Sequence, residues 1–326
     1  MRDQVSSKSY IVRRLLQTIP SVLIVLMVNF CIVRFAPGDP AQLIAGEGAT
    51  EAQVALISHS LGLDKPLPEQ LVTYFQGILH GDLGYSYLQG RPVWDLVMER
   101  IPNTLMLVIA ALLLAIAFGV TLGVIAANKP YSLLDNAVTV ISLTSYAMPA
   151  FWIAQMLLLA FAIYLPIFPA GGMTNVRNTS SGLMYVSDVA WHAILPIATL
   201  TLVYIAEQFR LTRSRMLEVL SQDYITTARA KGVKERGVLF KHALRNALLP
   251  VVTITGLRMG TFFTGAILTE FVYGWPGVGR LMFDSVFSRD YPVILGCFAF
   301  ISIFVIVGSL IIDLLYAELD PRIRYR

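Results

Sequence analysis

One stretch decides the fold class: residues 101–128, which read IPNTLMLVIAALLLAIAFGVTLGVIAAN and contain no charged residue. A bilayer core of about 30 Å needs about 20 consecutive apolar residues in a helix, so this stretch can cross a membrane. The whole chain of 326 residues is 56% hydrophobic and 14% charged, with a mean hydropathy of +0.66. Soluble domains carry about 25% charged residues. The composition therefore predicts an integral membrane protein.

Five further apolar blocks have the length of a spanning helix. Pro149 interrupts one of them and is expected to kink or break its helix, because proline removes a backbone hydrogen bond. Pro102 is expected in the first turn of the helix over 101–128, where proline is tolerated. The predicted spans are Leu15–Val33, Ile101–Asn128, Asn136–Leu165, Val189–Ala206, Asn246–Thr269 and Tyr291–Ile312. We predict an all-α, polytopic membrane protein with six transmembrane helices.

The first block has a rival interpretation as a cleavable signal peptide. The apolar core of a signal peptide has about 7–15 residues and ends at a small-residue cleavage site. The block Leu15–Val33 is longer and leads directly into Arg34. This pattern favours an uncleaved first helix.

The distribution of charge predicts the orientation. Basic residues gather at the amino terminus, at the carboxyl terminus and in the segment after the fourth span, whereas the loop after the first span is acidic. Cytoplasmic segments carry the excess of Lys and Arg, so both termini are expected in the cytoplasm and the protein in the inner (cytoplasmic) membrane. The long acidic loop is expected to fold on the periplasmic side. The predicted organisation is 1–33 for the amino terminus and first helix, 34–100 for the periplasmic loop, and 101–326 for the core with a cytoplasmic loop over 214–245.

The cytoplasmic loop has the pattern of a helix–turn–helix. Apolar residues recur at helical spacing in its first half, and Gly232 stands where a left-handed C′ residue would end that helix. The expected stripe consists of Leu217, Leu220, Tyr224, Ile225 and Ala228. An amphipathic helix with basic flanks can lie on anionic lipid. The small residues Thr226, Thr227, Ala228 and Ala230 would instead let another protein approach closely, so spacing alone leaves both interpretations open.

Several motifs carry a resemblance to a known family. They are the run DYITTARAKG over 223–232 with HALRNALLPVV over 242–252, and also APGDP over 36–40, LGLDKP over 61–66, GDLG over 81–84, TE over 269–270, GWPGVGR over 274–280 and DPRIR over 320–324. In this order they cover nearly the whole chain. The chain resembles the permease subunits of ABC importers, in the dipeptide/oligopeptide family and its B-type subunit, and the run over 223–232 resembles their EAA loop.

The resemblance implies a subunit of an importer with four kinds of partner. These are a homologous C-type permease, one or two cytoplasmic ABC ATPases, a periplasmic or extracellular substrate-binding protein, and the lipid bilayer; no nucleic acid is implied. It assigns ATPase docking to Asp223, Tyr224, Thr226, Thr227, Ala228, Arg229, Ala230, Lys231 and Gly232. The chain itself lacks the phosphate-binding motif G-x-x-x-x-G-K-[ST]. We therefore expect no bound cofactor and no catalytic residue here, with ATP hydrolysed by the partner subunits.

The EAA loop departs from the general importer pattern in two places. Thr226-Thr227-Ala228 replaces Glu-Ala-Ala, so no glutamate-mediated contact is carried over, and Arg245 stands where the general pattern has proline. Lys234 occupies the position where Ser or Thr would cap the second helix, which predicts a weak helix start.

Other functions leave weaker signals in the sequence. An intramembrane enzyme would need paired acids, a Ser/His arrangement or a metal site within the spans; the four histidines lack metal-ligand spacing, and Cys31 and Cys297 read as small apolar residues. An ion-coupled transporter needs ionisable residues at mid-membrane, and Arg258 is the candidate, with a role in the translocation path.

Trp152, Trp191 and Trp275 are expected as anchors at the membrane–water interface. The family pattern is shared by importers of dipeptides, oligopeptides, nickel chelates, glutathione and oligosaccharides.

Overall fold

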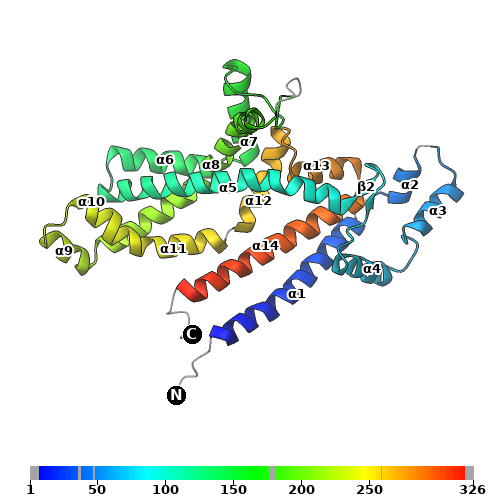
Figure 1. Ribbon diagram of the computed structural model, residues 1–326, viewed down its shortest axis with the longest axis horizontal. Coiled ribbons are helices and arrows are strands. Elements are labelled where there is room, and N and C mark those ends of the chain that lie inside the picture. Colours follow the sequence, from blue (N-terminus) through cyan, green and yellow to red (C-terminus); the bar gives the residue numbers. More distant parts are fainter. Residues whose placement is uncertain (1–6, 36–37, 47, 176–180, 258, 320–326) are drawn as a thin grey trace. The chain divides into compact units, whose positions relative to one another are not determined.

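The protein was analysed as a computed structural model that describes residues 7–35, 38–46, 48–175, 181–257 and 259–319, and it is built almost entirely from helices (Figure 1). It divides into two compact units. The first contains residues 1–103 and 276–326, and the second contains residues 104–275. Helix α5 (Val93–Asn128) begins in the first unit and continues into the second.

The first unit is organised around two long helices that lie side by side, α1 (Ser7–Arg34) and α14 (Tyr291–Leu319) (Figure 1). Between α1 and α5 the chain forms short elements, as expected for the loop after the first span. They are α2 (Pro40–Ala45), α3 (Glu51–Ser60), α4 (Leu67–Leu79) and a hairpin of β1 (Tyr85–Ser86) with β2 (Arg91–Pro92). Helix α13 (Val278–Ser288) precedes α14.

Local sequence explains where these short helices begin and end. The side chain of Asp39 accepts a 2.9 Å hydrogen bond from the backbone N–H of Ala41 at the start of α2. Thr50 and Gln53 form a reciprocal capping box at the start of α3. Turns follow α3 and α4 at 62–66 and 81–84, and they contain Gly62 and Gly81 with positive φ.

The start of α5 differs from the expectation. We predicted Pro102 in the first turn, but the helix begins at Val93 and Pro102 lies inside it. The physical reason is tertiary packing. Val93, Leu96 and Val97 are buried in one apolar cluster of the first unit, and this burial extends the helix through residues that precede the uncharged stretch. The other members of the cluster are Val278, Leu281, Val293 and Cys297.

The second unit packs its helices against α8 (Leu183–Leu220). Its other elements are α6 (Leu133–Ala147), α7 (Ala150–Leu158) with the π-helical turn η1 (Leu159–Tyr164), α9 (Asp223–Ala230), α10 (Glu235–Gly237), the π-helical turn η2 (Val238–Ala243), α11 (Leu244–Leu257) and α12 (Met259–Val272). Trp275 was predicted as an interface anchor, and this is wrong. Its side chain is fully buried in the cluster that contains Leu107, Leu200, Tyr204 and Phe262.

Two glycines on α5 allow a close approach to α8. A Cβ at Gly119 would lie 2.6 Å from the Cβ of Gln208, and a Cβ at Gly123 would lie 2.8 Å from the Cβ of Thr212. Small residues four positions apart let two helix backbones pack closely in a membrane. Gln208 and Thr212 are fully buried at this contact.

Four helices in the described part of the chain are long and apolar enough to cross a membrane: Leu16–Arg34, Val93–Asn128, Leu183–Leu220 and Tyr291–Leu310. The predicted break at Pro149 is confirmed, because α6 and the α7–η1 segment are bent by 106°; counted as one span, this pair makes a fifth. The predicted span Asn246–Thr269 consists of α11 and α12, two 14-residue helices on either side of position 258. Six spans stay a prediction.

Candidate functional site

The EAA-like run forms a short separate helix, α9, with a defined end. The backbone N–H of Gly232 donates to Arg229 O at 2.9 Å, and the N–H of Val233 donates to Ala228 O at 3.3 Å. Gly232 has φ +75°. This is the Schellman arrangement, in which a left-handed residue closes a helix. The predicted C′ role of Gly232 is confirmed.

The two faces of α9 differ sharply in burial. Ile225 is fully buried and Ala228 is 8% exposed, and both turn toward the body of the second unit. The remaining residues predicted for docking are exposed: Asp223, Tyr224, Thr226, Thr227, Arg229, Ala230, Lys231 and Gly232. The expected apolar stripe is corrected in one respect, because Tyr224 is 42% exposed. The expected small surface keeps Thr226, Thr227 and Ala230 but has Ala228 on the inner face.

Ile225 joins α9 to three long helices through one buried cluster, here called the base cluster. Its buried members are Val124 and Ala127 of α5, Met216 of α8, Ile225, Val238, Leu239 and Ala243 of η2, and Ala247 of α11. Apolar burial contributes about 1.5–3 kcal/mol for one large aliphatic side chain. Ile225 therefore packs α9 directly against residues of α5, α8 and α11.

Two polar contacts fix the orientation of α9. Asn246 Nδ2 on α11 donates a 2.7 Å hydrogen bond to Tyr224 Oη. Arg229 Nη2 lies 2.8 Å from Glu235 Oε1 across the Gly232 turn. This guanidinium lowers the pKa of the Glu235 carboxyl below its ordinary value, and the carboxylate raises the pKa of Arg229.

The surface around α9 is basic. Residues beyond the helix add exposed cations that the positive charge of the loop predicted. These are Lys231, Lys234, Arg236, Lys241 and Arg245. Lys234 precedes α10 and makes no side-chain cap, as expected. Phe240, which precedes Lys241 in sequence, is also exposed. The arrangement suits an acidic macromolecular surface, because the exposed cations spread along the loop.

Sequence reasoning missed a buried ion pair near this site. Arg213 of α8 donates to both carboxylate oxygens of Asp135 in the first turn of α6, at 2.5 and 2.6 Å. The backbone N–H of Tyr131 adds a 2.8 Å hydrogen bond to Asp135. The available signal was an acid at the start of an apolar block, since such a charge needs a partner.

The other candidate residues lie outside the loop 214–245 in sequence. Arg258, the candidate for the translocation path, lies outside the described residues. Cys297 is buried and Cys31 is half-buried, and neither forms a disulfide. Among the described residues, no group of three or more His, Cys, Asp and Glu side chains could hold a metal ion.

Comparison with known proteins gives the family. Residues 119–325 match the family described as "Binding-protein-dependent transport system inner membrane component", and residues 8–108 match its amino-terminal domain, "Binding-prot-dependent transport system membrane comp, N-term". The chain belongs to this permease family. It is therefore a multi-pass permease of the inner membrane, and the resemblance found in the sequence is confirmed.

Relatives match the permease over almost its whole length. The oligopeptide transport system permease protein AppB of Bacillus subtilis is 42% identical over 97% of this chain and 99% of its own. The dipeptide transport system permease protein DppB of Escherichia coli K12 is 40% identical with the same coverage. The glutathione transport system permease protein GsiC of Pectobacterium atrosepticum is 39% identical over 98% of this chain and 99% of its own.

Proposed function

We propose that this chain is the B-type transmembrane subunit of an ATP-driven importer of dipeptides or oligopeptides. The relatives with 42% and 40% identity are named for oligopeptide and dipeptide transport. The observation that carries the mechanism is the construction of α9. Its outer face is exposed and basic, and its inner face is fixed by Ile225 to the helices of the permease.

The proposed energy source lies on other subunits. The sequence has no G-x-x-x-x-G-K-[ST] motif that would cradle the phosphates of ATP. In our proposal one or two cytoplasmic ABC ATPases bind the exposed residues of α9 and the loop 214–245. Their movement during ATP hydrolysis displaces α9, and the base cluster transmits it to α5, α8 and α11. A homologous C-type permease completes the pathway, and an external binding protein delivers the substrate.

The proposed topology has six spans with both termini in the cytoplasm. The loop 34–100 lies outside, and α11 with α12 forms the fifth span. The basic loop 214–245 and the acidic loop 34–100 support this orientation, because retained positive charge marks the cytoplasmic side. Single cysteines at Glu47 and Lys234 are expected to react with an impermeant thiol reagent from opposite sides. Labelling of both from one side would overturn the topology.

Cross-linking tests the docking proposal directly. A cysteine at Thr227, on the exposed face of α9, is expected to cross-link to an ATPase subunit in the assembled importer, with a yield that changes when ATP is added. A cysteine at Glu51, which begins α3, serves as the control and is expected to give no ATPase product. If Thr227 is instead protected by anionic lipid and yields no protein product, α9 is a membrane-surface helix.

The substrate is tested with the binding protein and with liposomes. The ligand that co-purifies with the external binding protein identifies the cargo, and a peptide is expected. Glutathione is the alternative that the name of one relative supports. Nickel chelates and oligosaccharides are the other alternative substrates. Liposomes that contain only this chain are expected neither to hydrolyse ATP nor to accumulate peptide. Uptake by this chain alone, driven by an ion gradient, would assign it to ion-coupled transport instead.

A further inference from the structure

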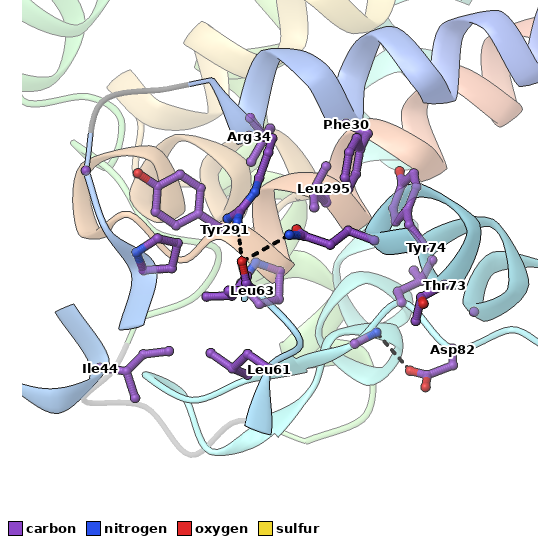
Figure 2. A pocket seen from close by; sticks show the side chains of 18 residues that line it. Phe30, Arg34, Ile44, Leu61, Leu63, Thr73, Tyr74, Asp82, Tyr291 and Leu295 are labelled. Atoms are coloured by element: carbon purple, nitrogen blue, oxygen red, sulfur yellow. Dashed lines mark hydrogen bonds between the residues drawn. The ribbon is translucent and has the colours of Figure 1, made fainter. Parts of the chain in front are cut away.

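The first unit contains a cavity of about 290 Å³ where α1 ends and α14 begins. Its walls come from α1, α14 and the short elements of the loop between α1 and α5 (Figure 2). Most of the lining is apolar, with Phe30 and Val33 on α1, Leu295 on α14, and Leu61 and Leu63 beyond α3. This volume is at the lower end of the roughly 300–1,000 Å³ of small-molecule sites. The space accommodates one apolar chain or a part of a larger amphiphile.

Arg34 is the cationic side chain that lines the cavity. Its side chain lines the cavity from the last turn of α1, and Nη2 donates one hydrogen bond of 3.0 Å to the carbonyl oxygen of Leu63. The residue is only partly exposed, and it forms no ion pair with any other residue that the structure describes. Charges removed from water are normally paired. A partly buried guanidinium without a counter-charge favours an anionic ligand.

The remaining polar groups leave Arg34 available. Gln70 Nε2 donates to the same Leu63 oxygen at 3.1 Å, so this carbonyl accepts two hydrogen bonds. Asp82 also lines the cavity, but it lies across the space from Arg34 (Figure 2), and its Oδ1 accepts from the backbone N–H of Gly84 at 2.8 Å. The carboxylate of Asp82 therefore does not neutralise Arg34.

A second guanidinium lies beside the cavity. A Cβ at Gly38, which lines the cavity, would be 3.0 Å from Arg289 Nη1 and 3.0 Å from Tyr291 Oη. Arg289 is exposed and forms no ion pair with a described residue. Arg289 thus adds a second cationic group on the Gly38 side of the cavity. A phosphate or carboxylate can accept hydrogen bonds from such planar guanidinium groups.

The position of the cavity beside an exposed apolar surface indicates which class of anion binds there. Ile32 and Phe35, which flank Arg34 in sequence, are 60% and 72% exposed. The exposed apolar surface of α1 therefore continues to the level of Arg34, and α1 is one of the helices able to cross the membrane. An amphiphilic molecule on this surface can place its hydrocarbon chain against the apolar walls of the cavity and its polar headgroup near the two arginines. We propose that this cavity binds an anionic membrane lipid, with one acyl chain between α1, α4 and α14 and its phosphate at Arg34.

Photolabelling of the full-length chain tests this site. The protein is purified in a mild, lipid-free detergent and exposed to phosphatidylglycerol that carries a diazirine near the end of one acyl chain. Labelled peptides are expected from α1, α4 or the start of α14. Unlabelled phosphatidylglycerol should compete roughly tenfold better than phosphatidylcholine with the same chains, because the choline cation of phosphatidylcholine offsets the charge of its phosphate and is repelled by Arg34.

Two variants distinguish recognition of the lipid headgroup from binding of the acyl chain. Arg34→Gln keeps a donor for the Leu63 oxygen but removes the charge, and it is expected to reduce labelling roughly tenfold. Leu295→Trp fills the space and is expected to abolish labelling. The matched controls are Arg91→Gln, whose arginine pairs with Glu99 at 3.0 Å, and Val307→Trp on an exposed part of α14. Both controls should label as the unchanged protein does.

Three results would overturn the proposal. Equal competition by phosphatidylcholine would show that the anion is not recognised. Labelling that Arg34→Gln and Leu295→Trp both leave unchanged would show that the lipid lies on the general apolar surface of the helices. Displacement of the label by a dipeptide, but not by excess phosphatidylglycerol, would assign the cavity to the transported substrate.

Discussion

Arg213 and Asp135 form a bidentate ion pair, in which Nε and Nη2 of Arg213 lie 2.5 and 2.6 Å from the two carboxylate oxygens of Asp135. The pair joins the first turn of α6 to α8 across 78 positions of sequence. The side chain of Asp135 is 1% exposed and that of Arg213 is 23% exposed. Removal of either partner leaves the other charge largely out of water.

Asp135→Asn is expected to destabilise the permease strongly. A buried ion pair that loses one partner costs about 3–5 kcal/mol, because the remaining charge is uncompensated. Thermal unfolding in detergent measures the change. Arg213→Gln should have a similar effect, and the double variant should be less destabilised than the sum of the two, since neither charge remains.

The matched control for this pair is Glu218→Gln. Glu218 lies 2.9 Å from Arg215, but both side chains are well exposed, at 62% and 40%. Exposed ion pairs contribute about 0–1 kcal/mol. Equal effects of Asp135→Asn and Glu218→Gln would show that burial gives the Asp135 pair no special role.

The two faces of α9 are expected to respond differently to a new negative charge. Ala228→Glu places a carboxylate at an 8% exposed position of the inner face, and it is expected to lower the unfolding free energy by more than about 2 kcal/mol. Thr227→Glu, on the exposed face, is expected to change it by less than about 0.5 kcal/mol. Thr227→Glu should nevertheless reduce substrate-stimulated ATP hydrolysis in the reconstituted importer, because the added carboxylate lowers the positive charge of the proposed docking surface. Normal ATP hydrolysis with Thr227→Glu would contradict the proposed docking face.

Features that depend on local chemistry were predicted from the sequence. The uncharged stretch 101–128, the break at Pro149 and the helix end at Gly232 each follow from a backbone or solvation rule that a few consecutive residues satisfy. The family resemblance was also readable, because its motifs are short and ordered along the chain.

Features that depend on distant packing were not predicted. Trp275 fits an interface position by composition, but it is buried because α5, α8 and α12 converge on it. The exposure of Tyr224 depends on which side of α9 meets the base cluster, and helical periodicity identifies an apolar stripe without fixing which residues lie at its edge. The pairing of Asp135 with Arg213 depends on the register of α6 against α8, which no local pattern encodes.

The Arg229–Glu235 pair predicts a pH response of the docking turn. Arg229 lowers the pKa of Glu235 below its ordinary value of 4.5, so the stabilisation is present above that ordinary value and is lost as the pH falls through the lowered pKa. Both side chains are about half exposed, and exposed pairs contribute no more than about 1 kcal/mol. Amide hydrogen exchange of residues 223–233 should therefore become modestly faster, relative to the intrinsic rates, between pH 5 and pH 3. Glu235→Gln should remove this pH-dependent change, and an unaltered profile would exclude the pair as its cause.

Gly232 provides the sharpest test of coupling, because its substitution alters backbone conformation without a steric clash. A Cβ at Gly232 would meet no described atom within 4 Å, so the cost comes from φ +75° alone. A left-handed backbone costs a non-glycine residue roughly 1–2 kcal/mol, and asparagine tolerates it better. Gly232→Val should therefore insert normally and lower the thermal midpoint by only a few degrees, yet lose substrate-stimulated ATP hydrolysis and uptake, whereas Gly232→Asn should retain much of both. Gly81→Val is the matched control, since Gly81 has φ +77° and open space around it and ends α4 with the same pair of backbone hydrogen bonds, but lies in the loop 34–100. If Gly232→Val transports as well as Gly81→Val, the orientation of α9 does not control coupling.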